Sequence, residues 1–280
     1  MFLLRGGATP QQALEALDEA HSILFNAQGH PRNPRYDFES NPCSALLEAV
    51  PEVEVRLGNA FDRQWIAETL FTPRYWNLMQ ARMATAPVNN AASNERRYQM
   101  ERLEQIKADV QELATFAAMG GTILVIDTNT LMHANPLEQI VWTRNGIAKG
   151  EMVRVLVPLA VIAELDRKKF EAHDNTKKKA ADAIRRLYKH RKGLNPDVPA
   201  SFITTDNTTL ALEIPRDDLG RTRTANTDDE IRDFGVFVKQ ITGRPVTVVT
   251  RDMNLQIKCQ RVGLEVLWLA DDDMKQTQPN

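Results

Sequence analysis

The chain has 280 residues, of which 42% are hydrophobic, and its formal net charge is −2. This length fits one large domain or two ordinary ones, and the charge excludes overall electrostatic attraction as the source of any affinity for nucleic acid. The apolar run Phe2–Leu4 is too short for a signal peptide and no stretch could cross a bilayer, so we expect a cytoplasmic protein. Cys43 and Cys259 lack a CxxC partner, so neither a zinc site nor a disulfide framework is expected.

Residues 1–119 are expected to form an all-helical region of unknown role. After Pro10, the apolar residues of Gln11–Asn26 recur with the spacing of an amphipathic helix. Proline residues are then expected to interrupt regular structure at Pro31, Pro34 and Pro42. In the later part, a helical pair is expected at residues 59–70 and 75–83, followed by a loop at 84–93 and one long helix at 94–119.

The long helix predicted over residues 94–119 carries apolar residues at alternating spacings of three and four. They are Leu103, Ile106, Val110, Leu113 and Ala117. This spacing is typical of a coiled-coil seam, here about two heptads long. Two heptads are short for a free-standing dimer, so packing onto the chain's own N-terminal helices is favoured over self-association. A homo-oligomer, or a protein partner bound through the N-terminal region, stays open as an alternative.

Four short runs in the C-terminal part are almost continuously apolar and β-branched, as expected of strands covered on both faces. They are Thr122–Ile126, Val153–Pro158, Val246–Thr250 and Leu264–Leu269. Segments with helical spacing lie between them, and this alternation predicts an α/β domain with a parallel sheet. Residues 201–214 alternate around Asp206 and Asn207, which predicts a hairpin with Asp206 in its turn.

Acidic residues follow strands or begin helices at four places, Asp127, Glu164, Asp228 and Asp252. Ligands of open α/β sheets bind outside the carboxyl ends of the strands, so these carboxylates should meet at one edge. Carboxylates so close repel one another, and Mg²⁺ or Mn²⁺, which take carboxylate and water ligands, would offset the repulsion. Because such a site activates water and stabilises the oxygens of a phosphodiester, the implied reaction is phosphodiester hydrolysis.

Each acidic motif alone has a simpler explanation. Asp127 could belong to an ordinary turn and Glu164 to a solvated helix face, while Asp228 and Asp252 could be acids favoured at helix N-termini. A phosphatase of the haloacid dehalogenase type also has an acid after its first strand, but it needs a second Asp where this chain has Asn129. We reject that class. The joint order of the four motifs favours one shared site.

Together the motifs resemble a PIN domain, the metal-dependent nuclease fold of bacterial toxins, ribosome-maturation factors and the endonucleases of nonsense-mediated decay. The matching segments are Val125–Asn129, Val161–Asp166, Asn226–Ile231 and Thr250–Leu255. The resemblance covers residues 121 to about 270 and implies a three-layer α/β fold with a parallel sheet. It further implies metal ligation by Asp127, Glu164, Asp228 and Asp252, with support from Asn129, Thr250 and Asp229. The expected division is residues 1–119, a nuclease domain at 120–270 and a flexible tail at 271–280.

The segment from Arg167 to Lys192 holds eleven basic and three acidic residues. It begins just after Glu164, so its cations are expected to bind the phosphates of a substrate and draw it in. The expected RNA-binding residues are Arg167, Lys168, Lys169, Lys177, Lys178 and Arg185. A pair of solvated helices is the simpler alternative. The nearby rings, expected in the core rather than on a base-stacking surface, are Phe170, Tyr188 and Phe202.

These observations predict a metal-dependent endoribonuclease that cleaves single-stranded RNA with Mg²⁺ or Mn²⁺. A DNA nuclease would use the same carboxylates. A noncatalytic RNA-binding or scaffold module would bind through the basic segment without cleaving, and the intact acidic set disfavours it. A toxin controlled by a cognate antitoxin is also disfavoured, because such toxins are typically a bare PIN domain and this chain has 119 further residues.

Overall fold

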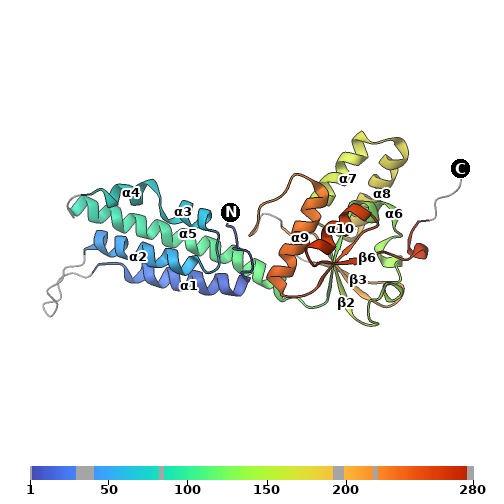
Figure 1. Ribbon diagram of the computed structural model, residues 1–280, viewed down its shortest axis with the longest axis horizontal. Coiled ribbons are helices and arrows are strands. Elements are labelled where there is room, and N and C mark those ends of the chain that lie inside the picture. Colours follow the sequence, from blue (N-terminus) through green and yellow to red (C-terminus); the bar gives the residue numbers. More distant parts are fainter. Residues whose placement is uncertain (1, 30–40, 82–84, 192–198, 217–219, 276–280) are drawn as a thin grey trace. The chain divides into compact units, whose positions relative to one another are not determined.

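The computed structural model describes residues 2–29, 41–81, 85–191, 199–216 and 220–275 (Figure 1). The chain divides into two compact units. The helical unit comprises Met1–Ala118 with Leu219–Arg221, and the sheet unit comprises Met119–Asp218 with Thr222–Asn280. Within the described ranges, no helix combines the length and the apolar character that crossing a membrane requires.

The helical unit consists, in its described part, of five helices. They are α1 (Pro10–Asn26), α2 (Pro42–Leu57), α3 (Arg63–Leu70), α4 (Pro73–Met79) and α5 (Ala86–Ala118). The first four begin after residues whose side chains accept a hydrogen bond from the first helical turn, namely Thr9, Asn41, Asp62 and Thr72. Helices α1 and α2 both pack along α5 (Figure 1). The seam residues Leu103, Ile106, Val110 and Leu113 of α5 are buried, so the long helix packs onto the chain's own helices as predicted.

Two expectations for this unit are wrong. Residues 86–93 were expected to be a loop, but α5 already begins at Ala86; residue 84 lies outside the described residues. Pro87 is the second residue of α5, where the missing N–H of a proline removes no helical hydrogen bond. Pro42 was expected to break regular structure, but it is the first residue of α2, capped by Asn41. The predicted breaks at residues 31 and 34 lie outside the described ranges.

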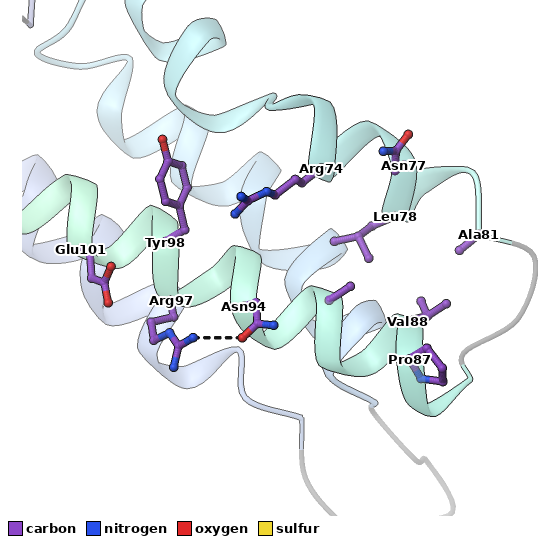
Figure 2. Close-up of a pocket in the computed structure, with 11 residues that line it drawn as sticks. Arg74, Asn77, Leu78, Ala81, Pro87, Val88, Asn94, Arg97, Tyr98 and Glu101 are labelled. Carbon is purple, nitrogen blue, oxygen red and sulfur yellow. Dashed lines mark hydrogen bonds between the residues drawn. The ribbon is translucent and has the colours of Figure 1, made fainter.

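A groove of about 730 Å³ lies between α4 and α5. Figure 2 shows Arg74 and Leu78 of α4 facing Asn94, Arg97 and Tyr98 of α5. The guanidinium carbon of Arg74 lies 5.5 Å from the centroid of the Tyr98 ring, and Arg97 donates a hydrogen bond to Asn94 at 3.0 Å. Every residue that lines the groove belongs to the helical unit, so none of the predicted site residues contributes to it.

The sheet unit is built, in the described part of the chain, on a six-stranded sheet with the order β3-β4-β2-β1-β5-β6. The strands are β1 (Thr122–Ile126), β2 (Met152–Leu156), β3 (Ala200–Ile203), β4 (Thr209–Glu213), β5 (Val246–Val249) and β6 (Glu265–Leu267). All neighbours are parallel except β3 and β4, which form an antiparallel hairpin. The predicted α/β class with a mostly parallel sheet after an all-helical region is therefore confirmed, and so is the hairpin.

Helices alternate with these strands. They are α6 (Thr128–His133), α7 (Leu159–Glu171), α8 (Asp174–Arg191), α9 (Thr227–Thr242) and α10 (Met253–Arg261), with short 3₁₀ turns at Leu137–Gln139, Trp142–Asn145 and Asp271–Asp273. Helix α9 packs on β5 and α10, and α10 packs on β6. Gly235 allows this close packing, because a Cβ atom there would lie 2.9 Å from a methyl carbon of Leu264.

One ion pair lies inside the sheet. Arg154 of β2 is fully buried, and its guanidinium donates to both carboxylate oxygens of Glu213 on β4, at 2.6 and 2.7 Å. A third hydrogen bond runs from Arg154 to the carbonyl of Met119 at 3.0 Å. The bidentate geometry explains how a strand that is otherwise apolar accommodates a charged residue.

The segment after β6 is more ordered than the expected tail. Asp273 is buried and accepts hydrogen bonds from the Val141 N–H at 3.0 Å and the Asn145 side chain at 2.7 Å. The N–H of Lys275 donates to the carbonyl of His133 at 2.8 Å. Residues 271–275 are thus anchored to the sheet unit, and the remainder of the expected tail, 276–280, lies outside the described residues.

Candidate active site

The four predicted acids lie after strands or in the helices that follow them. Asp127 follows β1 and caps α6, while Asp252 follows β5 and caps α10. Glu164 lies in α7, after β2, and Asp228 lies in the first turn of α9. Since β2, β1 and β5 are adjacent and parallel, their carboxyl ends meet at one edge of the sheet.

Asp127 is the most buried of the four acids, with 2% of its surface exposed. Its carboxylate accepts hydrogen bonds from the Thr130 N–H at 2.6 Å and the Thr250 hydroxyl at 2.5 Å. Burial raises the pKa of Asp127, the hydrogen bonds from Thr130 and Thr250 oppose that rise, and the charge of Asp252 adds to it. No lysine or arginine among the described residues forms an ion pair with Asp127. The fold therefore holds a desolvated carboxylate in a fixed orientation, and among the described residues no basic side chain pairs with it.

Thr250 connects the first and fourth motifs. Its hydroxyl, which is fully buried, donates to Asp127 and accepts from the Asp252 N–H at 3.0 Å. The Thr250 N–H donates to the carbonyl of Leu267 at 3.1 Å, so the ends of β5 and β6 are also joined. Thr250 thus contacts two of the predicted acids.

Glu164 is joined to the first motif by Thr128, whose hydroxyl donates to it at 2.6 Å. Lys168, one turn later in α7, forms an ion pair with Glu164 at 3.0 Å and lies 3.4 Å from the side-chain oxygen of Asn129. Thr128 was not among the predicted site residues. Its signal in the sequence was its place directly after Asp127, between two residues already assigned to the motif.

Asp228 contacts the helix that Asp252 caps. Its carboxylate accepts a hydrogen bond from Asn254 at 3.4 Å and lies 3.8 Å from the ammonium group of Lys258. Asp229 instead pairs with Lys258 of α10 at 3.1 Å and with Arg232 of its own helix at 3.0 Å. Sequence reasoning missed Lys258, which lies in α10 three residues after the fourth motif.

Cys259 is a buried thiol of α10. Burial raises the pKa of this thiol to about 11. The positive charge of Arg232 opposes the rise, whereas the charges of Asp228 and Asp127 add to it. Both carboxylates therefore act on one buried atom of α10.

Hydrogen bonds through neighbouring side chains connect the acids to the other motifs. Among the described residues, no group of three or more His, Cys, Asp or Glu side chains is arranged to hold a metal ion. The links are Asp127 to Asp252 through Thr250, Glu164 to the first motif through Thr128, and Asp228 to α10 through Asn254. The donors are carboxylate oxygens, which suit a hard divalent cation.

The predicted RNA-binding residues lie on α7 and α8. Arg167, Lys169, Lys178 and Arg185 are exposed, whereas Lys168 and Lys177 are half-buried. The Arg186 guanidinium, in contrast, donates to the backbone carbonyls of Leu131 and Ala134 at 2.6 and 3.2 Å, so it stabilises the fold. The side chain of residue 191 and all of Lys192 lie outside what the structure describes.

The rings beside this basic segment differ from expectation. Phe170 and Tyr188, expected in the core, are 70% and 64% exposed. Phe202 stacks on His190, with ring centroids 4.1 Å apart. The two exposed rings lie on the same helices as the basic residues, Phe170 on α7 and Tyr188 on α8.

The fold and the site define the chain as an α/β protein with carboxylates gathered at the carboxyl edge of a mostly parallel sheet. The family model of the PIN domain matches residues 124–269, and the chain belongs to this family. The helical N-terminal region is not assigned to a family by this match. PIN domains are a family of nucleases that typically bind divalent metals. No curated protein matches the chain.

Proposed function

We propose that this protein is a metal-dependent endoribonuclease that hydrolyses phosphodiester bonds of single-stranded RNA. The observation that supports it most is Asp127, a buried carboxylate held by two hydrogen bonds, with no ion-pair partner among the described residues. Keeping such a group desolvated is costly unless a positive charge compensates it. In a member of the PIN family, the catalytic metal would supply this compensating positive charge.

The residues present fit that metal. Asp127, Glu164, Asp228 and Asp252 would hold Mg²⁺ or Mn²⁺, which when bound would supply an activated water and neutralise charge on the phosphodiester. The hydroxyls of Thr250 and Thr128 donate to the carboxylates of Asp127 and Glu164, and Thr250 also accepts from the Asp252 N–H. Asn129 and Asp229 would support the edge. Lys168 and Lys258 contact Glu164 and Asp228. A divalent cation would compete with these ammonium groups for the carboxylates, and displaced lysines would be free to bind phosphate.

The basic segment supports RNA as the substrate. Four of the six predicted RNA-binding side chains are exposed on α7 and α8, and the exposed rings Phe170 and Tyr188 accompany them. Cations bind a phosphate backbone of any sequence, and aromatic rings stack on unpaired bases. This combination favours a single strand over a duplex.

The test is cleavage of end-labelled single-stranded RNA and of DNA with the same sequence. Wild type and Asp127→Asn are compared with Mn²⁺, Mg²⁺ or EDTA. We expect internal cleavage of RNA that requires metal and falls by at least about 100-fold in Asp127→Asn, since metal-ion catalysis is worth several kcal/mol. Asp166→Asn is the matched control, because Asp166 is an exposed acid two residues after Glu164. This variant should cleave RNA at the rate of wild type.

The other outcomes separate the alternatives. Preferential cleavage of DNA, lost in Asp127→Asn, would identify a DNA nuclease that uses the same carboxylates. RNA binding without cleavage under every metal would identify a noncatalytic RNA-binding module and refute the proposal. Equal cleavage by wild type and Asp127→Asn would indicate a contaminating nuclease.

A further inference from the structure

One exposed aromatic ring lies at the carboxyl edge of the sheet, outside the basic segment. Trp268 directly follows β6 and is 50% exposed. Among the described residues of the sheet unit, the other exposed aromatic rings, Phe170 and Tyr188, lie on α7 and α8. A large apolar ring left half in water at the edge where ligands bind is a candidate contact for substrate.

Hydrogen bonds at the ends of β5 and β6 connect the neighbour of Trp268 to the carboxylates. Its neighbour Leu267 accepts the hydrogen bond from the Thr250 N–H, and the Thr250 hydroxyl orients Asp127. Arg251 separates Thr250 from Asp252 in the chain. The ring therefore adjoins the segment that positions the first and fourth acids.

The orientation of the ring is supported by Arg251. The guanidinium carbon of Arg251 lies 4.7 Å from the centroid of the Trp268 ring, a cation–π contact. Arg251 is in turn paired with Asp271 at 2.5 Å, and the residues that follow Asp271 are anchored through buried Asp273. The guanidinium thus contacts the ring and is itself held by Asp271, and half of the Trp268 surface is left exposed where a base could stack.

We infer that Trp268 and Arg251 form a stacking platform for one unpaired base beside the phosphodiester that is cleaved. The inference rests on the proposed function, to which it adds the reason for a single-stranded substrate. A base in an A-form duplex is stacked on its neighbours and cannot reach an aromatic side chain, whereas a base in a single strand can. Stacking tolerates every base, because every base has a π-face, so the platform selects strandedness and not sequence.

The test measures binding apart from cleavage. Affinity for a labelled 12-nucleotide single-stranded RNA is determined in EDTA, with every protein carrying Asp127→Asn so that no hydrolysis occurs. We expect Trp268→Ala to weaken binding by roughly 5- to 100-fold, the usual effect of removing one stacking ring, and Trp268→Phe to retain most of the affinity. Trp76→Ala is the matched control, because Trp76 is 49% exposed but belongs to α4 of the helical unit.

An oligonucleotide series tests the contact itself. Single abasic sites are placed along the RNA, and one position should weaken binding to the Trp268-containing protein but cause no further loss with Trp268→Ala. The same RNA annealed to its complement should bind equally to both proteins. Thermal unfolding and circular dichroism of Trp268→Ala must match its parent, and Trp268→Phe provides the comparison if they do not.

Failure of this inference is distinguishable from failure of the proposed function. Wild-type protein that cleaves RNA, together with Trp268→Ala that binds within twofold of its parent, would overturn the platform and leave the nuclease. Protein that binds single strands through Trp268 but never cleaves would refute the nuclease and retain the platform. Absence of RNA binding in the parent protein would overturn both.

Discussion

Thr250 places one hydroxyl between two acids, and its effect should be measurable. The hydroxyl donates to Asp127 and accepts from the Asp252 N–H, so Thr250→Val removes both contacts and leaves a buried carboxylate with one partner fewer. We expect cleavage to fall about 10- to 100-fold, as is usual when a group that orients a metal ligand is lost, and Thr250→Ser to restore most of it.

Thr247 offers a matched control for that experiment. It lies three residues earlier, on β5, and its hydroxyl donates a hydrogen bond to Glu265 at 2.9 Å instead of to a site residue. Initial cleavage rates with saturating Mn²⁺ are compared for Thr250→Val, Thr250→Ser and Thr247→Val. Equal rates for the two valine variants would show that the Thr250 hydroxyl has no part in catalysis.

Asp127 should cost the protein stability when no metal is present. Burial raises its folded-state pKa above the ordinary value of 3.8. For an acid with a raised folded pKa, the unfolded chain ionises first, so the penalty is fully present above the folded pKa and disappears as the pH falls below the unfolded one. Asp127→Asn should therefore melt at a higher temperature than wild type in EDTA at pH 7.5.

The pH dependence of the melting temperatures serves as the control for this prediction. The difference in melting temperature between Asp127→Asn and wild type should shrink as the pH is lowered toward 4, because both then carry an uncharged side chain at this position. Melting curves followed by circular dichroism at several pH values measure the difference. A variant that is less stable than wild type at neutral pH would indicate that the hydrogen bonds of the charged form outweigh its desolvation.

At the scale of elements, β2 and β4 depend on one buried ion pair. Glu213→Ala would leave the Arg154 guanidinium in the sheet without its bidentate partner. Removing one member of such a pair typically costs about 3–5 kcal/mol, whereas replacing both by apolar residues of similar volume is often nearly neutral. We therefore expect a large loss in Glu213→Ala and substantial recovery in Arg154→Met with Glu213→Leu.

Urea unfolding, with amide exchange of β2 and β4 as the local readout, measures these differences. The exposed pair of Arg56 with Glu52 on α2 is a useful control, because surface pairs are worth at most about 1 kcal/mol and Glu52→Ala should have little effect. Equal losses from Glu213→Ala and Glu52→Ala would contradict the importance of the buried pair.

The elements that sequence could predict are those specified by neighbouring residues. The strand before Asp127 is legible because five consecutive apolar or β-branched residues precede an N-cap acid. The hairpin is legible from its alternation, and Asp206 lies in its turn, where it accepts hydrogen bonds from Thr204 and Thr143. The helix at 42–57 could not be predicted from the sequence, because Pro42 and Pro51 suggest breaks in regular structure. In the structure, the Asn41 cap and the buried apolar face of the helix outweigh these prolines.

Partners distant in the chain could not be predicted. Glu213 lies 59 positions after Arg154, and nothing local to the second strand indicates that its arginine has a bidentate partner. The contacts of Lys258 and Trp268 could not be predicted either. Lys258 meets Asp228 only once α10 has folded, and Trp268 meets Arg251 only because β6 lies beside β5. The four acids and Thr250 could be named from the motifs, but the hydrogen bond from Thr128 and the ion pairs of Lys168 and Lys258 required the tertiary structure.

At the scale of the whole molecule, the small formal charge averages over strongly charged segments that lie in one of the two units. The chain carries a formal charge of only −2, yet the segment from Arg167 to Lys192 is strongly basic and the acids of the site lie close to it in the same unit. All four acids and every predicted RNA-binding residue belong to the sheet unit, and the helical unit supplies none of them. The consequences of metal binding should therefore be localised.

Hydrogen exchange with and without Mn²⁺ can test that localisation. A cation that binds only the folded state adds about 2.7 kcal/mol when present at 100 times its dissociation constant. This stabilisation should slow the exchange of amides in β1, β5 and the first turn of α10, whereas peptides from α1 and α5 should exchange at unchanged rates. Asp127→Asn and Asp252→Asn should abolish the effect, because each removes one of the carboxylates linked through Thr250. Protection that persists in both variants, or that is equal in the two units, would mean that Mn²⁺ binds elsewhere on the surface and that these carboxylates are not its ligands.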